Sequence, residues 1–214
     1  MVPVRKVDLS MWLRANYPIN KSSKSKRKSI CGFGINDADY VVNPTINGCR
    51  VPCLAYATWR GLIQRSVDLG YKLKHPAYQD VTVWAGWQHF MAFRRWWLFN
   101  YIEGYEIDKD LLSPDVKVYS PATCIFIPQW LNVFIKETPN KSKGVLFESD
   151  RNKFKATLKH ENRTINLGRF DSAQSASRAV KEAKLNIIYS RKNLIEDLRP
   201  GLLSIVIRKV EEGP

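Results

Sequence analysis

The fold is decided by residues 143–183, KGVLFESDRNKFKATLKHENRTINLGRFDSAQSASRAVKEA. Apolar residues alternate with polar ones in three short runs, which is typical of strands that bury one face. The apolar positions are Val145 and Phe147, then Phe154, Ala156 and Leu158, then Ile165 and Leu167. Turn-forming residues separate the runs at 149–152 and 161–162. The pattern predicts a small three-stranded antiparallel sheet with one apolar face.

A helix is predicted directly after the third run. Asp171 or Ser172 can cap its first turn, because both side chains accept hydrogen bonds from free backbone N–H groups. Its apolar stripe follows helical spacing and consists mostly of small residues: Ala176, Ala179, Val180, Ala183 and Ile187. Small residues let a helix lie close to a sheet. We therefore expect the helix to cover the apolar face and to leave the polar face of the sheet open.

The charge balance favours a polyanionic partner. The chain of 214 residues has 34 Lys and Arg against 20 Asp and Glu, a formal net charge of +14. Such a surplus is the electrostatic signature of nucleic-acid binding, with a merely basic surface as the alternative. Residues 21–29, KSSKSKRKS, concentrate cations in a polar stretch that we expect to be mobile. They are interpreted either as phosphate contacts or as a solvated linker: Lys24, Lys26, Arg27 and Lys28.

Neither a membrane span nor a disulfide framework is expected. The sequence has no run of 18 apolar residues, and its first residues lack the apolar core of a signal peptide, so we expect a cytoplasmic protein. Four scattered cysteines are too few for a disulfide scaffold. Cys49 and Cys53 have a spacing close to that of zinc ligands, but no second pair lies nearby, so structural zinc is not expected.

The central region alternates between aromatic and polar segments. Helices are predicted over 54–68 and 85–99, a short strand over 81–84, and one short helix within 1–20. The second helix places aromatic residues on one face, which indicates a core: Trp87, Phe90, Phe93 and Trp97, with Leu98. Residues 31–50 are expected to be irregular, with a short strand or two. A β-hairpin that turns at 113–115 is predicted over 105–119, followed by a strand and a helix over 125–135.

The C-terminal stretch resembles the AP2 domain, a three-stranded DNA-binding module of plant transcription factors and phage nucleases. The resemblance rests on Gly144-Val145, Lys153-Phe154-Lys155-Ala156, Leu167-Gly168-Arg169-Phe170-Asp171 and Ala176…Ala179. It implies that the open sheet face enters the major groove of duplex DNA. The contacts it implies are Arg151, Lys153, Lys155, Thr157, Lys159, Arg163, Thr164 and Asn166. Leu146 and Glu148 stand where that family usually has Arg.

Residues 32–134 resemble phage-encoded HNH-type (His-Me finger) homing endonucleases that carry such a module. The resemblance rests on GFGINDADY at 32–40 and, above all, on IDKDLL at 107–112, VYSP at 118–121 and CIFIP at 124–128. It implies that Asp108 and Asn132 bind a divalent metal, Mg²⁺ or Mn²⁺, which stabilises charge on the scissile phosphate. The position that activates water in this class falls on Lys109, flanked by Asp108 and Asp110. A solvated charged turn is the alternative interpretation of these three residues.

We therefore expect an α+β protein in four parts. These are a basic flexible segment at 1–30, an aromatic-rich HNH-like ββα domain at 31–137, an AP2-like domain at 143–192 and an extension at 193–214. The first functional hypothesis is a metal-dependent phage DNA endonuclease or nickase. The second is a non-catalytic double-stranded DNA-binding protein on a degenerate HNH fold, acting as a regulator or as an inhibitor of a host enzyme. RNA binding is a third hypothesis, without a motif to support it.

Overall fold

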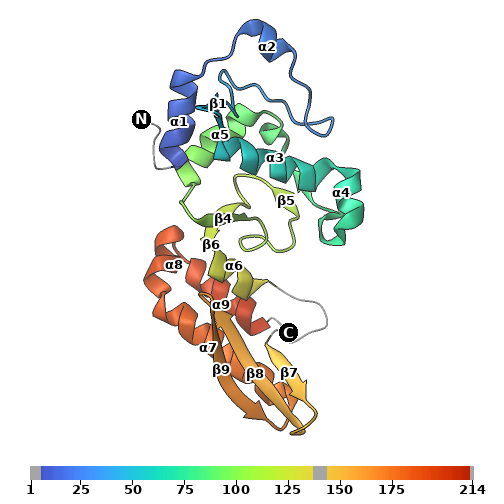
Figure 1. Cartoon of the computed structure of the whole chain (residues 1–214). Helices are drawn as coiled ribbons and strands as arrows, with labels where there is room; N and C mark the ends of the chain where they lie inside the picture. Colours follow the sequence, from blue (N-terminus) through green and yellow to red (C-terminus); the bar gives the residue numbers. More distant parts are fainter. Residues whose placement is uncertain (1–5, 137–143, 213–214) are drawn as a thin grey trace. The chain divides into compact units, whose positions relative to one another are not determined.

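A computed structural model of the chain describes residues 6–136 and 144–212 (Figure 1). The chain divides into two compact units, residues 1–126 and 127–214, and each is described by itself. This boundary lies earlier than the expected limit at 137, because the helix that begins at Gln129 packs with the C-terminal elements. Within the described residues, no helix is both long enough and apolar enough to cross a bilayer.

The first unit is built mainly of helices. They are α1 (Lys6–Asn16), α2 (Lys21–Ser25), α3 (Leu54–Val67), α4 (Leu69–Lys74) and α5 (Phe90–Asn100). Single 3₁₀ turns at Pro76–Tyr78 and Ala85–Trp87 join them. The predictions of α1 and α3 are confirmed. The helix predicted over 85–99 begins only at Phe90, because Ala85–Trp87 forms a 3₁₀ turn instead.

The strands of the first unit are short and pair in twos. β1 (Thr45–Ile46) and β2 (Cys49–Arg50) are antiparallel, β3 (Thr82–Val83) pairs in parallel with β5 (Val118–Tyr119), and β4 (Tyr105–Asp108) pairs with β6 (Ile125–Pro128). The predicted hairpin over 105–119 is therefore wrong, since β4 and β5 have different partners. The carboxylate of Asp108 accepts two backbone hydrogen bonds at the end of β4. The chain therefore turns at this point and does not continue into a hairpin with β5.

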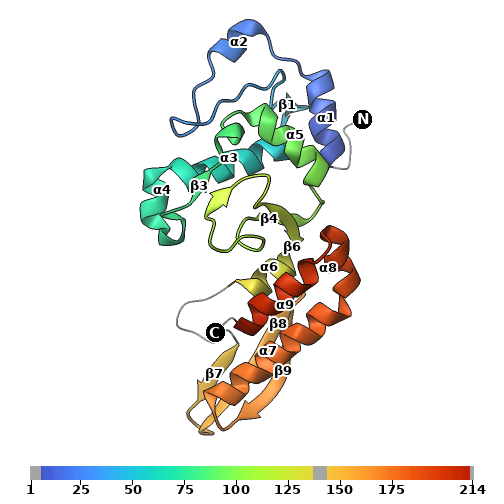
Figure 2. The same cartoon turned by 180° about the vertical axis from the view of Figure 1, so that it is seen from behind.

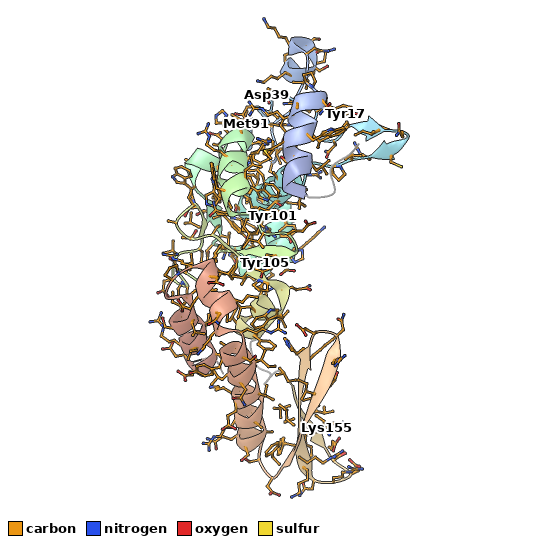
Figure 3. All side chains as sticks on the ribbon, turned by 90° about the vertical axis from the view of Figure 1, so that its left-hand side faces the viewer. Tyr17, Asp39, Met91, Tyr101, Tyr105 and Lys155 are labelled. Carbon is orange, nitrogen blue, oxygen red and sulfur yellow. The ribbon has the colours of Figure 1, made fainter. Side chains whose placement is uncertain are left out.

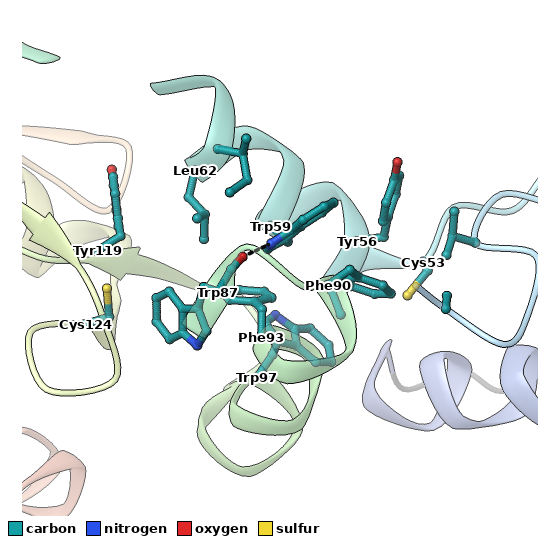
Figure 4. Close-up of a cluster of buried hydrophobic side chains, with 14 of the residues drawn as sticks. Cys53, Tyr56, Trp59, Leu62, Trp87, Phe90, Phe93, Trp97, Tyr119 and Cys124 are labelled. Carbon is teal, nitrogen blue, oxygen red and sulfur yellow. Dashed lines mark hydrogen bonds between the residues drawn. The ribbon is translucent and has the colours of Figure 1, made fainter. Parts of the chain in front are cut away.

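An aromatic core holds the first unit together (Figure 4). The stripe predicted on α5 is confirmed as core, since Phe90, Phe93 and Trp97 are fully buried. Trp59 of α3 packs against Phe90 and donates a hydrogen bond of 2.7 Å from Nε1 to the carbonyl oxygen of Trp87. This bond satisfies the one polar atom of a buried indole, so the ring can lie in the core at no loss of hydrogen bonding.

The second unit is a three-stranded antiparallel sheet with helices on one face. It contains α6 (Gln129–Ile135), β7 (Val145–Glu148), β8 (Lys153–His160), β9 (Arg163–Phe170), α7 (Ala173–Ser190), α8 (Lys192–Leu198) and α9 (Leu202–Glu212). The strand order is β7-β8-β9, as the sequence predicts. Of the two candidate caps, Ser172 is the residue whose side chain accepts from the backbone N–H of Ser175.

Helix α7 lies along one face of the sheet (Figure 2). Ala156 and Leu158 of β8 are buried, as are Ala176 and Val180 of α7. Residues 193–214 are more than an extension in their described part, because α8 and α9 pack against each other and α9 packs on α7 and α6. The helical layer therefore has several members, and all of them leave the opposite face of the sheet uncovered.

A bulge interrupts β9. Ala156 faces Gly168 while the next residue, Thr157, faces Asn166, so Leu167 has no opposite residue on β8. Gly168 has a φ of +113°, a backbone conformation that residues with a Cβ atom rarely adopt. The extra residue shifts the alternation of β9 by one position, and it therefore decides which side chains of this strand reach the open face.

Gly144 holds the start of β7 against β8. Its φ is +89°, its carbonyl oxygen accepts from the backbone N–H of Thr157 at 2.7 Å, and an added Cβ atom would lie 2.0 Å from the carbonyl oxygen of Thr157. We predict that Gly144→Ala destabilises the second unit by about 1–3 kcal/mol, because backbone strain and a steric clash add. Thermal unfolding followed by circular dichroism measures the effect.

Gly61 provides the opposite control for this substitution. It lies inside α3, has no positive φ, and an added Cβ atom would meet nothing within 4 Å. Gly61→Ala is expected to stabilise the protein by roughly 0.5–1 kcal/mol, since glycine is a poor helix former. Equal unfolding temperatures for Gly144→Ala and the unchanged protein would contradict the role given to Gly144.

Candidate nucleic-acid interface

The open face of the sheet carries a row of side chains set by the strand register. Lys155 lies directly opposite Leu146 on β7 and opposite Arg169 on β9, so these three side chains share one face. Lys155 is adjacent to Ala156, which is buried under α7, and successive side chains of a strand point to opposite faces. Figure 3 labels Lys155 on the sheet of the second unit. The row Leu146–Lys155–Arg169 therefore crosses the uncovered face.

Two further pairs extend this face toward the β8–β9 turn. Thr157 lies opposite Asn166, and Lys159 lies opposite Thr164. The side-chain oxygen of Asn166 accepts from the backbone N–H of Gly168 at 3.2 Å, so part of this amide is used to hold the bulge. Lys159 is exposed and forms no ion pair within the described residues. Of the cations predicted to contact DNA from the sheet, it is the one most available to an external anion.

Glu148 neutralises the centre of the open face. Its carboxylate accepts a hydrogen bond of 2.6 Å from Nε of Arg169, and Nζ of Lys155 lies 3.8 Å from the same carboxyl group. The hydrogen bond from Arg169 lowers the pKa of the Glu148 carboxyl, so this group stays ionised near neutral pH. The carboxylate thus lies between the two cations and partly neutralises both.

The other cations predicted on the module have local partners or lie elsewhere. Lys153 is paired with Asp171, and Arg151 lies in the β7–β8 turn, 3.4 Å from Asp150. Arg163 lies opposite His160, whose ring packs against Trp130 and Phe134 of α6. The register therefore takes Arg163 off the open face, where sequence reasoning had grouped it with Thr164 and Asn166.

The basic stretch at 21–28 is partly structured, in contrast to the expected mobile segment. Residues 21–25 form α2, capped by the side chain of Asn20. The guanidinium of Arg27 donates to the carbonyl oxygens of Asn36, Ala38 and Tyr40 at 2.6 to 3.0 Å. Desolvation lowers the pKa of Arg27. This residue therefore ties the 36–40 loop in place, while the other predicted contacts of the stretch are exposed, namely Lys24, Lys26 and Lys28.

Asp108 forms a turn with the residues that follow it. Its Oδ1 accepts from the backbone N–H groups of Asp110 at 2.9 Å and Leu111 at 2.7 Å, an arrangement known as an Asx turn. Lys109 is buried with 7% of its side chain exposed, donates from Nζ to the carboxylate of Asp110, and has its ammonium 5.7 Å from the ring centre of Tyr119. The interpretation of 108–110 as a merely solvated turn is therefore wrong for Lys109.

The side chains near Lys109 include a second cation and two groups that are uncharged at physiological pH. The guanidinium of Arg65 lies 5.3 Å from the same Tyr119 ring, and its Nε is buried without a hydrogen-bond partner in the described structure. Burial raises the pKa of the Tyr119 hydroxyl, and burial also raises the pKa of the Cys124 thiol to about 12. Both groups are therefore neutral at physiological pH. The cations of Lys109 and Arg65 face the ring of Tyr119, and Asp110 supplies the carboxylate that pairs with Lys109.

The turn fits a divalent metal poorly. Asp108 is committed to two backbone hydrogen bonds, and the ammonium of Lys109 beside Asp110 opposes a second positive charge. Asn132 is buried in α6, in the second unit, and has interactions of its own. In the described ranges, no three residues among His, Cys, Asp and Glu gather as a metal-binding group would.

The two cysteines with near-zinc spacing have separate environments. Cys49 is exposed in β2. Cys53 is buried, with its sulfur 3.2 Å from the hydroxyl of Tyr40 and 3.4 Å from that of Ser10. These contacts give Cys53 a place in the core of the first unit.

Comparison of this chain with protein-family models, with curated proteins and with solved structures gives no match. Arg169 is the functional candidate that sequence reasoning missed. A strict alternation through β9 places it on the apolar side, and the bulge moves it to the open face. The only sequence signal for the bulge is Gly168, a residue that often marks one inside a strand.

We predict that Lys109→Ala destabilises the first unit by about 1–3 kcal/mol, because it removes a buried apolar stem and a hydrogen-bonded ion pair. Lys109→Met, which keeps most of the stem, is expected to lose less. Six of the seven tryptophans lie in the first unit, so tryptophan fluorescence during urea unfolding follows that unit. An unfolding midpoint of Lys109→Ala equal to that of the unchanged protein would show that Lys109 has no structural role.

Proposed function

We propose that this chain binds double-stranded DNA through the open face of its C-terminal sheet. The observation that carries the proposal is the row of exposed polar and cationic side chains on a sheet face that no helix of the second unit covers. A narrow antiparallel sheet fits the major groove of B-form DNA, which also admits a two-stranded ribbon. The resemblance to the AP2 domain supports the same face and the same groove.

Charge supports the proposal in two ways. Lys155, Lys159 and Arg169 can contact phosphates that flank the groove, since cations supply most of the affinity for duplex DNA. The net charge of +14 and the exposed lysines at 24, 26 and 28 provide a diffuse attraction in addition. Glu148 competes with phosphate for Arg169 and Lys155, which weakens binding to the backbone alone and leaves a larger share of the affinity to base contacts.

Lys159→Ala is expected to weaken duplex binding several-fold. It is also expected to reduce the slope of log K against log salt by about 1, the change for one lost phosphate contact. Fluorescence anisotropy with a labelled duplex, measured over a series of salt concentrations, determines both quantities. Arg208→Ala is the matched control, because Arg208 is exposed on α9 in the helical layer. If Lys159→Ala and Arg208→Ala reduce the affinity for the duplex equally, binding is diffuse and the sheet face is not the binding site.

A substitution that removes a negative charge tests the same face. Glu148→Gln removes a negative charge and frees Arg169 and Lys155, so the affinity for duplex DNA is expected to rise several-fold, with a steeper salt dependence. An unchanged or weaker affinity of Glu148→Gln would contradict the placement of phosphates near these two cations.

A metal-dependent DNA endonuclease or nickase is the second candidate function. The observation in its favour is the order of β4, β6 and α6, with Asp108 at the end of the first strand and Asn132 in the helix. Lys109 would then donate to, or accept from, the reacting phosphate or water, and Mg²⁺ or Mn²⁺ would supply charge stabilisation. The present hydrogen bonds of Asp108 and the ammonium of Lys109 argue against it. The non-catalytic function, including regulation or inhibition of a host enzyme, therefore stands first.

Cleavage of supercoiled plasmid in the presence of Mg²⁺ or Mn²⁺ separates the two candidates. We expect the unchanged protein to leave the plasmid supercoiled. If it does nick, Asp108→Asn decides whether this turn is responsible, because Asn keeps the side-chain oxygen that caps the turn but loses the charge that a metal needs. A loss of cleavage by about 10²-fold or more, with DNA binding retained, would replace the non-catalytic proposal with the endonuclease.

A further inference from the structure

Leu146 is an apolar side chain in the middle of the charged open face. It is 66% exposed, and it lies opposite Lys155, which in turn lies opposite Arg169. Its direction is fixed by its neighbour, since Phe147 packs against Phe154 with ring centres 4.9 Å apart and alternate residues of a strand point to opposite faces. Burial of this exposed side chain against an apolar group of a partner would be favourable.

The two open-face residues of β7 set this strand apart from its neighbours. Leu146 has no charge and Glu148 has a negative one, so neither can contact a phosphate group favourably. The cations stand on β8 and β9, at Lys155, Lys159 and Arg169. If the cations contact the backbone, β7 faces the base edges. An apolar side chain on such a strand has one complementary feature in the major groove, the methyl group at C5 of a pyrimidine.

We propose that Leu146 is a specificity-determining residue that contacts the C5-methyl group of a pyrimidine, in thymine or in 5-methylcytosine. The inference rests on the proposed function and deepens it, because it names the base feature that this sheet recognises. A methyl group is buried against the leucine side chain and leaves water, which is favourable per unit of apolar area. Deoxyuridine pairs with adenine as thymine does but lacks this methyl group.

The test compares duplexes that differ only in methyl groups. An alternating A·T duplex presents a thymine methyl group at every base pair of the major groove, so Leu146 has one within reach in any register. The unchanged protein is expected to bind this duplex about fourfold more tightly than the same duplex with deoxyuridine, which corresponds to about 0.8 kcal/mol for one buried methyl group. A C·G duplex with and without 5-methylcytosine distinguishes the two sources of the methyl group.

Leu146→Ala identifies the side chain responsible. Because Leu146 is mostly exposed, its truncation is expected to leave the fold intact, which thermal unfolding verifies. The variant is expected to bind thymine and deoxyuridine duplexes with equal affinity and an unchanged salt slope. Leu194→Ala is the matched control, since Leu194 is an exposed leucine of α8 in the same unit, and it is expected to keep the fourfold preference.

The outcomes separate the two proposals. Absence of binding to every duplex overturns the proposed function, and this inference with it. Binding without a difference between thymine and deoxyuridine overturns the inference and leaves DNA binding standing. A preference for thymine that persists in Leu146→Ala overturns the assignment to Leu146. Only a preference that is present in the unchanged protein and lost in Leu146→Ala supports it.

Discussion

The close packing of α7 on β8 is the contact on which the second unit depends. Ala156 and Ala176 are fully buried, and Leu158 and Val180 nearly so. Alanine on both sides lets the backbone of the helix approach the sheet, so the sheet needs no second covering layer to bury its apolar face. The same contact determines the location of polar chemistry. Every residue of β8 that alternates with Ala156 and Leu158 is directed to the uncovered face, and all four of these residues are lysine or threonine.

The high net charge is partly consumed inside the first unit. Arg94 is buried and donates to Ser10 from two nitrogens, and its guanidinium lies over the ring of Tyr40. Arg27 is committed to three carbonyl oxygens, and Lys109 to Asp110. Arg27 stabilises the irregular 36–40 loop in this way, because its guanidinium satisfies three backbone oxygens at once. Composition alone therefore overstates how many cations are available to a partner.

Local patterns predict the sheet and α7 of the second unit but give residues 193–214, where α9 and most of α8 lie, only as an extension. The three strands and α7 follow from alternation and helical spacing, which depend on near neighbours in the sequence. The bulge in β9 depends on how two strands align, and it moves Arg169 to the open face. The pairing of β5 with β3 is likewise non-local, so local patterns around 113–115 wrongly predict a hairpin. For the candidate site, the resemblance to HNH-type endonucleases indicates Asp108, Lys109 and Asp110, but not that Lys109 is buried or that Asp108 caps its own turn.

The exposed cations of the first unit and the cations of the sheet differ in how firmly they are held in place. Lys24, Lys26 and Lys28 are exposed in the first unit and offer charge without a fixed geometry of partners. On the sheet, by contrast, Glu148 holds Arg169 and Lys155 in defined positions before any partner arrives. A cation that is already positioned loses little conformational entropy when it binds, but it must give up its carboxylate partner to contact a phosphate. The net gain from the backbone is therefore small at this face. Under the proposed function, discrimination among DNA sequences then depends on the uncharged groups beside these ion pairs, which are Leu146, Thr157 and Asn166.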